Sequence, residues 1–493
     1  MPPQPLVYEL NTRCWLRELS RGVSKPVTLA NVPTSEFEEW RRLGFTDIWL
    51  MGVWTTGPRA QRVALASQSQ RQHYSAALPG WQEVDVEGSP YAIADYDVPA
   101  PLGGLGGLQR FRELLHESGI RLILDFVPNH LGLDHAWLSE RSELFVQAPA
   151  DADGAFLQQT SLGPRWLAHG RDPNFPSWKD TVQLDYRRTE TRNAMVQLLQ
   201  KVAGYCDGVR CDMAMLLLSE IFATTWKNFP GSGCLTEEFW PAAIDAVKQV
   251  RPDFIFLAEA YWGLESRLQA LGFDYTYDKI LYDDVVAGDI PGLRRHLLEL
   301  PAQSLAASAH FLENHDERRI ASLLGFPEHR AASLLTLALP GMRLLHEGQL
   351  SGWTRSTPVQ LVRRMGETPD TKVQEWYSKL LLALVETSVG QGQATLLAPR
   401  PAWSGNPTAE NFMLILWSPN VGRFDLVVVN LSNDQSQCYA PLPAPGLTAH
   451  DWLLRDLLGS ERYQRKGEAL QRYGLYLDVP PHAAQLFRFD PYT

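Results

Sequence analysis

Apolar runs alternate with amphipathic segments along most of the chain. The runs are short and rich in branched and aromatic residues, as is typical of strands buried on both faces. The segments between them repeat apolar residues at the spacing of a helix, and a final helix is predicted over 372–386. The runs that we interpret as strands cover 6–11, 47–52, 120–127, 208–212, 254–259, 273–275, 309–313 and 341–346. The predicted helices between them cover 35–43, 105–118, 188–202, 238–250, 293–300 and 328–337.

This alternation predicts an α/β fold, and eight such units favour a closed (β/α)8 TIM barrel over an open sheet. The stretch 54–104 after the second strand is too long for a simple connection. The stretch 131–186 after the third strand is rich in proline and tryptophan and predicts a small irregular subdomain. We therefore predict a barrel domain over 1–390 that includes this subdomain.

The pattern changes after residue 386. Short β-like runs separated by Asn, Pro and Gly turns follow, which predicts a C-terminal antiparallel β-sandwich domain over 391–493. The runs cover 412–417, 424–431, 475–479 and 484–489.

Charge and composition exclude some partners. The formal net charge is −11, which argues against nucleic acid or an anionic membrane as the main partner. No apolar stretch reaches transmembrane length and the first residues lack the features of a secretory signal, so we expect a cytoplasmic protein without a membrane partner. The five scattered cysteines, at 14, 206, 211, 234 and 438, are expected to be reduced buried thiols rather than disulfides or metal ligands.

Three carboxylates lie at the downstream ends of predicted strands: Asp212, Glu259 and Asp316. Burying an acidic group is costly, so its repetition at one place on three strands suggests a shared site. The C-terminal ends of parallel barrel strands meet at the face where α/β barrels carry their chemistry. Taken singly, each acid could be an ion-pair, capping or turn residue, but those alternatives do not explain three coincidences at one end of a barrel.

The segments around these acids resemble a known family. Read in order, they are Asp125-Phe-Val-Pro-Asn-His130, Gly208-Val-Arg-Cys-Asp212, Ala258-Glu259-Ala-Tyr and Glu313-Asn-His-Asp316. In order and barrel position these resemble the four signature segments of the α-amylase family of retaining glycoside hydrolases (family 13). A fifth segment, Ser89-Pro-Tyr91-Ala-Ile-Ala-Asp95-Tyr96, resembles the stretch of that family that supplies a sugar-stacking tyrosine.

The resemblance implies separate roles for the three acids. Cleavage with retention needs a nucleophile and a proton donor, carboxyl groups that lie roughly 5–5.5 Å apart. Asp212 is the expected nucleophile, Glu259 the general acid/base with a pKa raised by apolar surroundings and neighbouring carboxylates, and Asp316 the carboxylate that favours the distorted transition state. Arg210 projects to the same strand face as Asp212, and its permanent charge is expected to keep Asp212 ionised.

The resemblance also implies substrate-binding residues. His130 and His315 match ligands of sugar hydroxyls, and Tyr91 matches the stacking tyrosine. Further tryptophans in loops of the same barrel face are candidates for lining more of the substrate cleft; these are Trp81, Trp166, Trp178 and Trp262.

The chain departs from the family pattern just after the nucleophile. Many members carry Lys-His where this chain has Met215 and Leu216, which leaves specificity on the acceptor side open. Asn129 and Asp185 remain as possible calcium ligands, but two are too few for an ion that takes six to eight oxygens. We therefore expect no obligatory cofactor, with calcium possible but not required.

The resulting expectation is a retaining α-glycoside hydrolase acting on α-glucosidic bonds in oligosaccharides or α-glucans. An α-glucanotransferase, or an α-glucoside isomerase or synthase, would use the same covalent intermediate with a sugar as acceptor. A barrel that has lost catalysis and serves in binding is disfavoured, since all three acids are present. The oligomeric state stays open.

Overall fold

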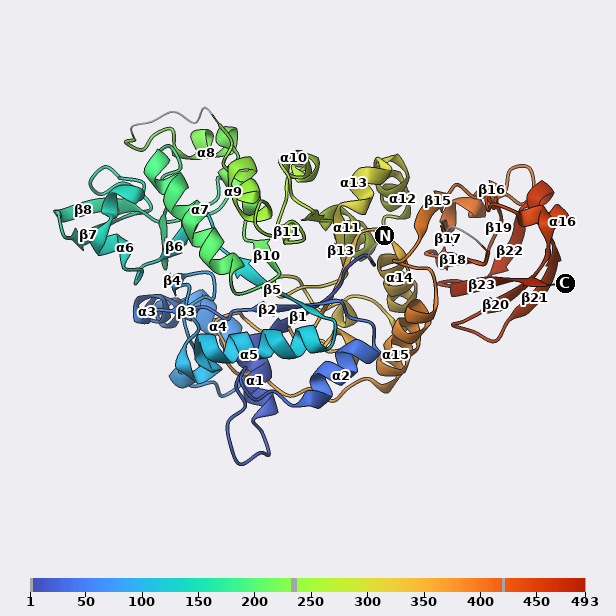
Figure 1. Ribbon diagram of the computed structural model, residues 1–493, viewed down its shortest axis with the longest axis horizontal. Coiled ribbons are helices and arrows are strands. Elements are labelled where there is room, and N and C mark those ends of the chain that lie inside the picture. Colours follow the sequence, from blue (N-terminus) through green and yellow to red (C-terminus); the bar gives the residue numbers. More distant parts are fainter. Residues whose placement is uncertain (1–2, 232–236, 419–421, 493) are drawn as a thin grey trace.

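Eight parallel strands close into a barrel in the computed structural model (Figure 1), which describes residues 3–231, 237–418 and 422–492. Around the barrel the order is β1-β14-β13-β12-β11-β10-β5-β2, so the predicted (β/α)8 fold is confirmed. The strands are β1 (Leu6–Asn11), β2 (Asp47–Met51), β5 (Arg121–Phe126), β10 (Gly208–Cys211), β11 (Ile255–Ala258), β12 (Tyr275–Tyr277), β13 (Ser308–Phe311) and β14 (Met342–His346).

The barrel strands are buried on both faces, which explains why they read as continuous apolar runs. Side chains of Val7, Trp49, Ile123, Leu257 and Leu344 belong to the cluster that fills the interior. The alternate residues pack outward against the helices. A barrel filled in this way is a packed core rather than a pore, so chemistry is left to the ends of its strands.

Helices surround the barrel. They are α1 (Thr12–Leu19), α2 (Thr34–Arg42), α5 (Gly104–Glu117), α7 (Thr189–Ala203), α8 (Ser219–Trp226), α9 (Phe239–Lys248), α10 (Glu265–Ala270), α11 (Lys279–Ala287), α12 (Ile290–Glu299), α13 (Ala302–Ala306), α14 (Phe326–Ala338) and α15 (Thr371–Glu386). The seven predicted helices correspond to α2, α5, α7, α9, α12, α14 and α15, with ends that differ by a few residues, whereas α1, α8, α10, α11 and α13 were not predicted.

The sixth strand was placed two residues too early by the sequence. It was expected over 273–275, whereas β12 covers Tyr275–Tyr277. Phe273 is apolar because its ring packs edge-on against Trp240 of α9, with centroids 4.7 Å apart. An apolar residue buried under a helix therefore imitated the start of a strand.

The long stretch after β2 is largely regular. It contains α3 (Pro58–Ala66) and α4 (Gln68–Ala77), and β3 (Thr55–Thr56) pairs with β4 (Ile93–Asp95). Ser67 separates the two helices, and its hydroxyl accepts from the N–H of Gln70 to cap α4. A serine cap of this kind stops one helix and starts the next without a longer loop.

The subdomain after the third barrel strand, expected to be irregular, carries two small antiparallel sheets. One pairs β6 (His130–Gly132) with β9 (Thr181–Gln183), and the other is the hairpin of β7 (Ala155–Thr160) and β8 (Gly163–Ala168). A short helix, α6 (Trp137–Glu140), lies between β6 and β7. Figure 1 shows β7 and β8 at the end of the molecule opposite the C-terminal domain.

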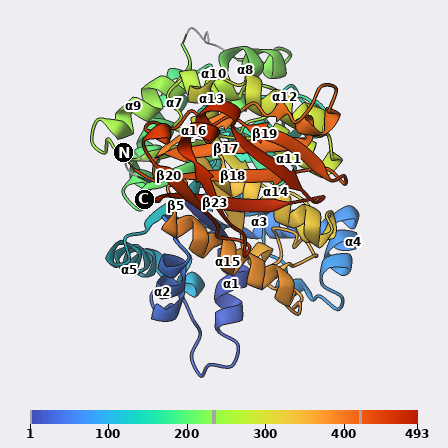
Figure 2. The ribbon, with the colours of Figure 1, turned by 90° about the vertical axis from the view of Figure 1, so that its right-hand side faces the viewer.

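The C-terminal domain consists of antiparallel strands in a six-stranded and a three-stranded sheet (Figure 2). A separate apolar cluster fills it, with Phe412, Leu426, Trp452 and Phe487 among its members. A helix, α16 (Gly467–Tyr473), follows the strand Arg462–Lys466. The larger sheet has the order β15 (Gln393–Leu397), β17 (Phe412–Ser418), β18 (Phe424–Asn430), β23 (Ala484–Tyr492), β20 (Asp451–Asp456) and β21 (Arg462–Lys466), and the smaller one β16 (Arg400–Pro401), β19 (Ser436–Ala440) and β22 (Leu475–Val479).

The structure bears on two further expectations, those on the cysteines and on membrane-spanning segments. Cys14, Cys206, Cys211 and Cys438 are free and buried, while Cys234 lies outside the described residues. Within the described ranges, no helix combines the length and the apolar character needed to cross a bilayer.

The indole of Trp417 joins the C-terminal domain to the barrel. This side chain is fully buried, and its Nε1–H donates to the carbonyl of Ala338 at the end of α14, at 2.8 Å. We predict that Trp417→Ala lowers the free energy of unfolding by about 3–5 kcal/mol, because it leaves a large cavity and an unsatisfied carbonyl. Urea unfolding followed by far-ultraviolet circular dichroism measures the loss.

A matched control is Trp403→Ala. Trp403 is 55% exposed, so its removal is expected to change stability by less than about 0.5 kcal/mol. Equal losses in the two variants would contradict the role given to Trp417.

Candidate active site

The three acids meet at the carboxyl ends of the barrel strands. Asp212 follows β10, Glu259 follows β11, and Asp316 lies in the loop after β13. Asp212 and Glu259 are buried, whereas the Asp316 side chain is 47% exposed. All three line one cavity of about 740 Å3, together with Tyr91 and His130. The structure thus brings together the residues that the sequence assigned to one site.

One guanidinium holds two of these acids. Arg210, fully buried on β10, donates from Nη1 to Asp212 Oδ1 at 2.9 Å, and its Nη2 forms an ion pair with Glu259 Oε2 at 2.8 Å. Its Nη1 also lies 3.5 Å from Asp125 Oδ1 on the neighbouring strand β5. The register explains this, because Arg210 is paired with Asp125 on one side and with Leu257 on the other. The sequence predicted the contact with Asp212 but not the sharing with Glu259 and Asp125.

Aromatic rings enclose the same guanidinium. Its Cζ lies 5.5 Å from the ring centroid of Trp49, 5.2 Å from that of Tyr91 and 5.8 Å from that of Tyr277. The faces of aromatic rings attract a cation, and desolvation strengthens that attraction. The rings and carboxylates together keep Arg210 charged and fixed in the barrel.

Burial governs the ionisation of both strand-end acids. It raises the pKa of Asp212, and Arg210 offsets this only in part. Arg210 acts in the expected direction, because its charge and its hydrogen bond favour the ionised form of Asp212, but burial opposes it and is the larger effect. Burial also raises the pKa of Glu259, with Asp212 and Asp316 adding to it against the opposing charge of Arg210. That direction was predicted and is the one a proton donor requires.

Two residues that sequence reasoning missed hold Glu259. The backbone N–H of Met213 donates to Oε2 at 2.6 Å, and the Tyr261 hydroxyl donates to Oε1 at 2.8 Å. Met213 has a φ of +44°, a left-handed conformation that costs a non-glycine residue energy and is concentrated at functional sites. The spacing Glu259-Ala-Tyr261 was visible in the sequence and could have suggested the second contact.

His315 uses both ring nitrogens within the protein. Its Nδ1 lies 2.5 Å from Glu9 Oε1, and its Nε2 lies 2.9 Å from Asp316 Oδ2 and 2.6 Å from the Tyr91 hydroxyl. Burial opposes its charge, but Asp316 and Glu9 outweigh burial and raise the pKa of His315 well above the ordinary value. In return, and against burial, His315 lowers the pKa of Asp316 to about 2. Glu9 did not figure in the sequence interpretation.

The other predicted sugar-binding residues line the cavity from two sides. The Tyr91 ring stacks on His315 with centroids 5.4 Å apart. His130 is buried, and burial lowers its pKa to about 4, so the ring is neutral near neutral pH. The ring of Trp178 lies 5.0 Å from that of His130 and also lines the cavity. Trp81, Trp166 and Trp262 are not among the described residues that do so.

Segments outside the barrel proper complete the cavity wall. The α3–α4 pair contributes Val63, Ala64, Ser67 and Gln70, and the stretch 177–181 and residues 359–360 close other sides. Met215 and Leu216, which replace the Lys-His of the family pattern, are buried in the short helix Ala214–Leu217. Met213 lines the cavity, whereas Met215 and Leu216 are not among the described residues that do so.

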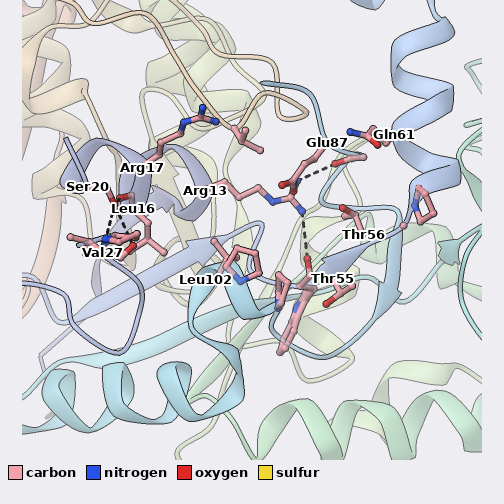
Figure 3. Close-up of a pocket in the computed structure, with 18 residues that line it drawn as sticks. Arg13, Leu16, Arg17, Ser20, Val27, Thr55, Thr56, Gln61, Glu87 and Leu102 are labelled. Atoms are coloured by element: carbon pink, nitrogen blue, oxygen red, sulfur yellow. Dashed lines mark hydrogen bonds and ion pairs between the residues drawn. The ribbon is translucent and has the colours of Figure 1, made fainter. Parts of the chain in front are cut away.

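A second cavity of about 470 Å3 lies beside α1 (Figure 3) and contains none of the three acids. Arg13 at its edge is buried, and every part of its guanidinium is engaged. It donates to the carbonyls of Gly52, Trp54 and Gly88 and forms an ion pair with Glu87 at 3.2 Å. Arg13 thereby ties the chain after β2 to the segment that leads to Tyr91.

Comparisons with known proteins agree on one family. A model described as the catalytic domain of alpha amylase matches residues 34–380. The chain is 25% identical over 274 residues to "Alpha-amylase MalA" of Haloarcula japonica, which covers 53% of this chain and 36% of that protein. It is 22% identical over 419 residues to a cyclomaltodextrinase of Geobacillus thermopakistaniensis, with 81% and 65% covered. The chain thus spans less than two thirds of the length of these curated relatives.

The fold is also found among solved structures. The crystal structure of a noncanonic maltogenic alpha-amylase AmyB from Thermotoga neapolitana has a TM-score of 0.68 with 18% identity, and 99% of both chains is covered. At this identity the likeness concerns the fold, barrel and C-terminal domain together.

The charge cluster around Arg210 makes a prediction about stability. Burial raises the pKa of Asp125 to about 7, although Arg210 opposes it. A carboxyl whose folded pKa lies above its unfolded value of about 3.9 loses stability as the pH rises between the two, by about 1.4 kcal/mol per pKa unit. Asp125→Asn, which keeps an acceptor for the Trp49 Nε1–H, should therefore gain stability relative to the parent from about pH 4.5 to about pH 7. Thermal unfolding across this range measures the difference.

The control differs in its pH window. Asp278 is buried between His296 and His310, whose hydrogen bonds lower its pKa against the effect of burial. A lowered carboxyl pKa contributes stability that is lost only below the unfolded value of about 3.9, so the stability lost in Asp278→Asn should stay nearly constant from about pH 4.5 to about pH 6. Parallel pH curves for the parent and Asp125→Asn would contradict the explanation of the Arg210 cluster.

Proposed function

The chain belongs to the alpha-amylase family, and on that premise we propose that it is a retaining α-glycoside hydrolase. It cleaves α-glucosidic bonds in oligosaccharides or α-glucans through a covalent glycosyl-enzyme intermediate. The observation that carries the proposal is the pair of buried carboxylates, Asp212 and Glu259, held on the two ends of the Arg210 guanidinium beside a cavity of about 740 Å3.

In the first step Asp212 attacks the anomeric carbon while protonated Glu259 gives its proton to the glycosidic oxygen. The bond between that carbon and oxygen breaks, the leaving sugar departs as an alcohol, and an ester to Asp212 forms. Glu259, now ionised, takes a proton from a water molecule, and the resulting attack on the anomeric carbon releases Asp212. The raised pKa of Glu259 supports its protonated state at the start of this cycle.

The remaining residues are assigned to binding. Asp316 stays ionised over a wide pH range. It can accept hydrogen bonds from hydroxyl groups of the sugar ring that becomes positively charged in the transition state. His130 is neutral and lies against Trp178 on the cavity wall, which suits a hydroxyl contact. The Tyr91 ring offers an apolar face to the sugar.

Asp212→Asn tests the nucleophile. An amide cannot form the ester, so we expect turnover of α-glucosides to fall by at least about 10³-fold while the circular dichroism spectrum stays unchanged. Asp153→Asn, at an exposed position of the small subdomain, is the matched control and should keep full activity. Near-parental turnover by Asp212→Asn would reject the assignment.

The substrate and the fate of the intermediate are read from the products. The parent protein is incubated with α-linked disaccharides, maltooligosaccharides and starch, and the anomers are followed by NMR. Retention gives the α-anomer first, so an initial β-anomer contradicts the mechanism. Free sugar as the main product supports hydrolysis. Longer or rearranged glucosides would show instead that the glycosyl group is transferred to a sugar.

We also propose that the enzyme needs no calcium. Both oxygens of the Asp185 carboxylate accept hydrogen bonds from Arg187, from Nε at 2.8 Å and from Nη2 at 2.9 Å. The side-chain carbonyl of Asn129 accepts from Gln183 at 3.0 Å. The chain's own donors thus satisfy the two oxygen ligands that the family pattern would offer to a calcium ion.

Dialysis against EDTA tests this proposal. Because a guanidinium already neutralises Asp185, we expect neither the melting temperature nor the activity to change. Arg187→Gln, which removes that cation, should lower the melting temperature and serves as the positive control for the assay. A fall after dialysis that calcium alone restores would overturn the proposal.

A further inference from the structure

We propose that Glu9, on the first barrel strand, is a positioning residue that holds the His315 ring in its cationic form, with Nε2–H directed at Asp316 and Tyr91. The inference deepens the proposed function and rests on it for its consequence in catalysis. Glu9 lies near the start of the barrel domain in the sequence, whereas His315 and Asp316 lie near its end.

The placement of Glu9 follows from strand register. Glu9 pairs with His346 on β14 and with Trp49 on β2, and it is fully buried. Val7, two residues earlier, belongs to the cluster that fills the barrel, so Glu9 projects to the same inner side. A carboxylate buried at this depth needs a hydrogen-bonded partner, and a cation is the partner that compensates it best.

His315 is the cation that Glu9 meets. Glu9 Oε1 lies 2.5 Å from His315 Nδ1, while Oε2 is buried and has no hydrogen-bond partner among the described residues. The other charged or titratable groups that face this pair from the packed elements are engaged elsewhere. Arg319 binds Glu313, and Arg364 binds Glu18 and Glu347. Arg210 binds Asp212 and Glu259 and lies beside Asp125. The remaining neighbours are His346, Tyr277 and Tyr91.

The geometry on the two ring nitrogens requires a proton on each. An ionised carboxylate only accepts hydrogen bonds, and His315 has Glu9 at Nδ1 and Asp316 at Nε2. A neutral imidazole has one N–H and would leave one of these carboxylates facing a lone pair. The pKa of His315, raised well above its ordinary value by Asp316 and Glu9 against burial, agrees with the doubly protonated ring.

The cationic ring connects Glu9 to the substrate cavity. Its Nε2–H reaches Asp316 Oδ2 at 2.9 Å and the Tyr91 oxygen at 2.6 Å, and both of these residues line the cavity. Asp316 is thereby kept ionised and oriented, and the Tyr91 ring is held against His315. If residue 9 lost its charge, the His315 ring would deprotonate at lower pH, and residue 9 at Nδ1 and Asp316 at Nε2 would compete for the one remaining N–H.

Glu9→Gln tests this, because glutamine keeps the size and the acceptor oxygen but removes the charge. The readout is the ¹⁵N chemical shift of the His315 ring nitrogens across a pH titration, with the signals identified by their absence in His315→Gln. We expect the parent ring to carry two N–H groups at neutral pH and the variant ring to deprotonate at least about one pH unit lower. The alkaline limb of the kcat/KM profile should move to lower pH with it.

Two further variants separate electrostatics from packing. Glu9→Asp keeps the charge on a shorter side chain and should restore most of the His315 titration. Glu347→Gln neutralises another buried carboxylate, directly after β14, that pairs with Arg364 rather than with His315, and should leave the titration near that of the parent. If Glu9→Gln folds poorly, the ¹⁵N titration of the parent still tests the inference, because a His315 ring that carries only one N–H at neutral pH overturns it.

The outcomes distinguish this inference from the proposed function. An unchanged His315 titration in Glu9→Gln overturns the inference, even if the parent cleaves α-glucosides. A titration that shifts as expected supports it, and since NMR needs no substrate, this holds even if the parent shows no glycosidase activity. A drop in melting temperature alone, without a shift in titration or pH profile, would mark Glu9 as a packing residue and overturn the inference.

Discussion

The site depends on one buried cation. Arg210 carries its guanidinium to the inner face of the barrel, where Asp125, Asp212 and Glu259 converge on it. Three buried carboxylates would be prohibitively costly without it, and a buried arginine would be equally costly without them. Asp212 follows Arg210 on the same strand, but Asp125 and Glu259 come from the two neighbouring strands, so β5, β10 and β11 must pair in register before all three carboxylates meet the cation. Folding and assembly of the site are therefore the same event at this place.

A second cation, His315, organises the opposite side of the cavity. It joins Glu9 to Asp316, and Tyr91 links it to the first cluster, since the Tyr91 ring lies 5.2 Å from the Arg210 guanidinium while its hydroxyl contacts His315. The two clusters give the acids different environments. Burial raises the pKa of Glu259, whereas His315 lowers that of Asp316 to about 2. Environments that push the pKa values of neighbouring acids apart let one donate a proton while another stays charged.

The pattern of strands along the sequence was enough to predict where the three acids lie. Asp212, Glu259 and Asp316 were found because each follows an apolar run, and the order of the runs set their place around the barrel. Glu9 was missed because its partner lies 306 residues away, and nothing local marks a carboxylate inside the first strand. The opposing effect of burial on the pKa of Asp212 was missed for a related reason. Its neighbour Arg210 is visible in the sequence, but the depth of burial that outweighs that neighbour is set by the whole barrel.

Segments outside the barrel strands shape the cavity beside the acids. The Arg210 cluster lies at the strand ends, but much of the cavity wall is made by α3, α4 and the stretch 177–181. The two helices belong to a stretch that the sequence marked only as too long for a simple connection, and α3 contributes Val63 and Ala64 to the wall. Met213, in a left-handed turn, donates its N–H to Glu259 and also lines the cavity. Because this one strained residue both holds Glu259 and forms part of the wall, we expect a substitution that reshapes the wall here also to move Glu259.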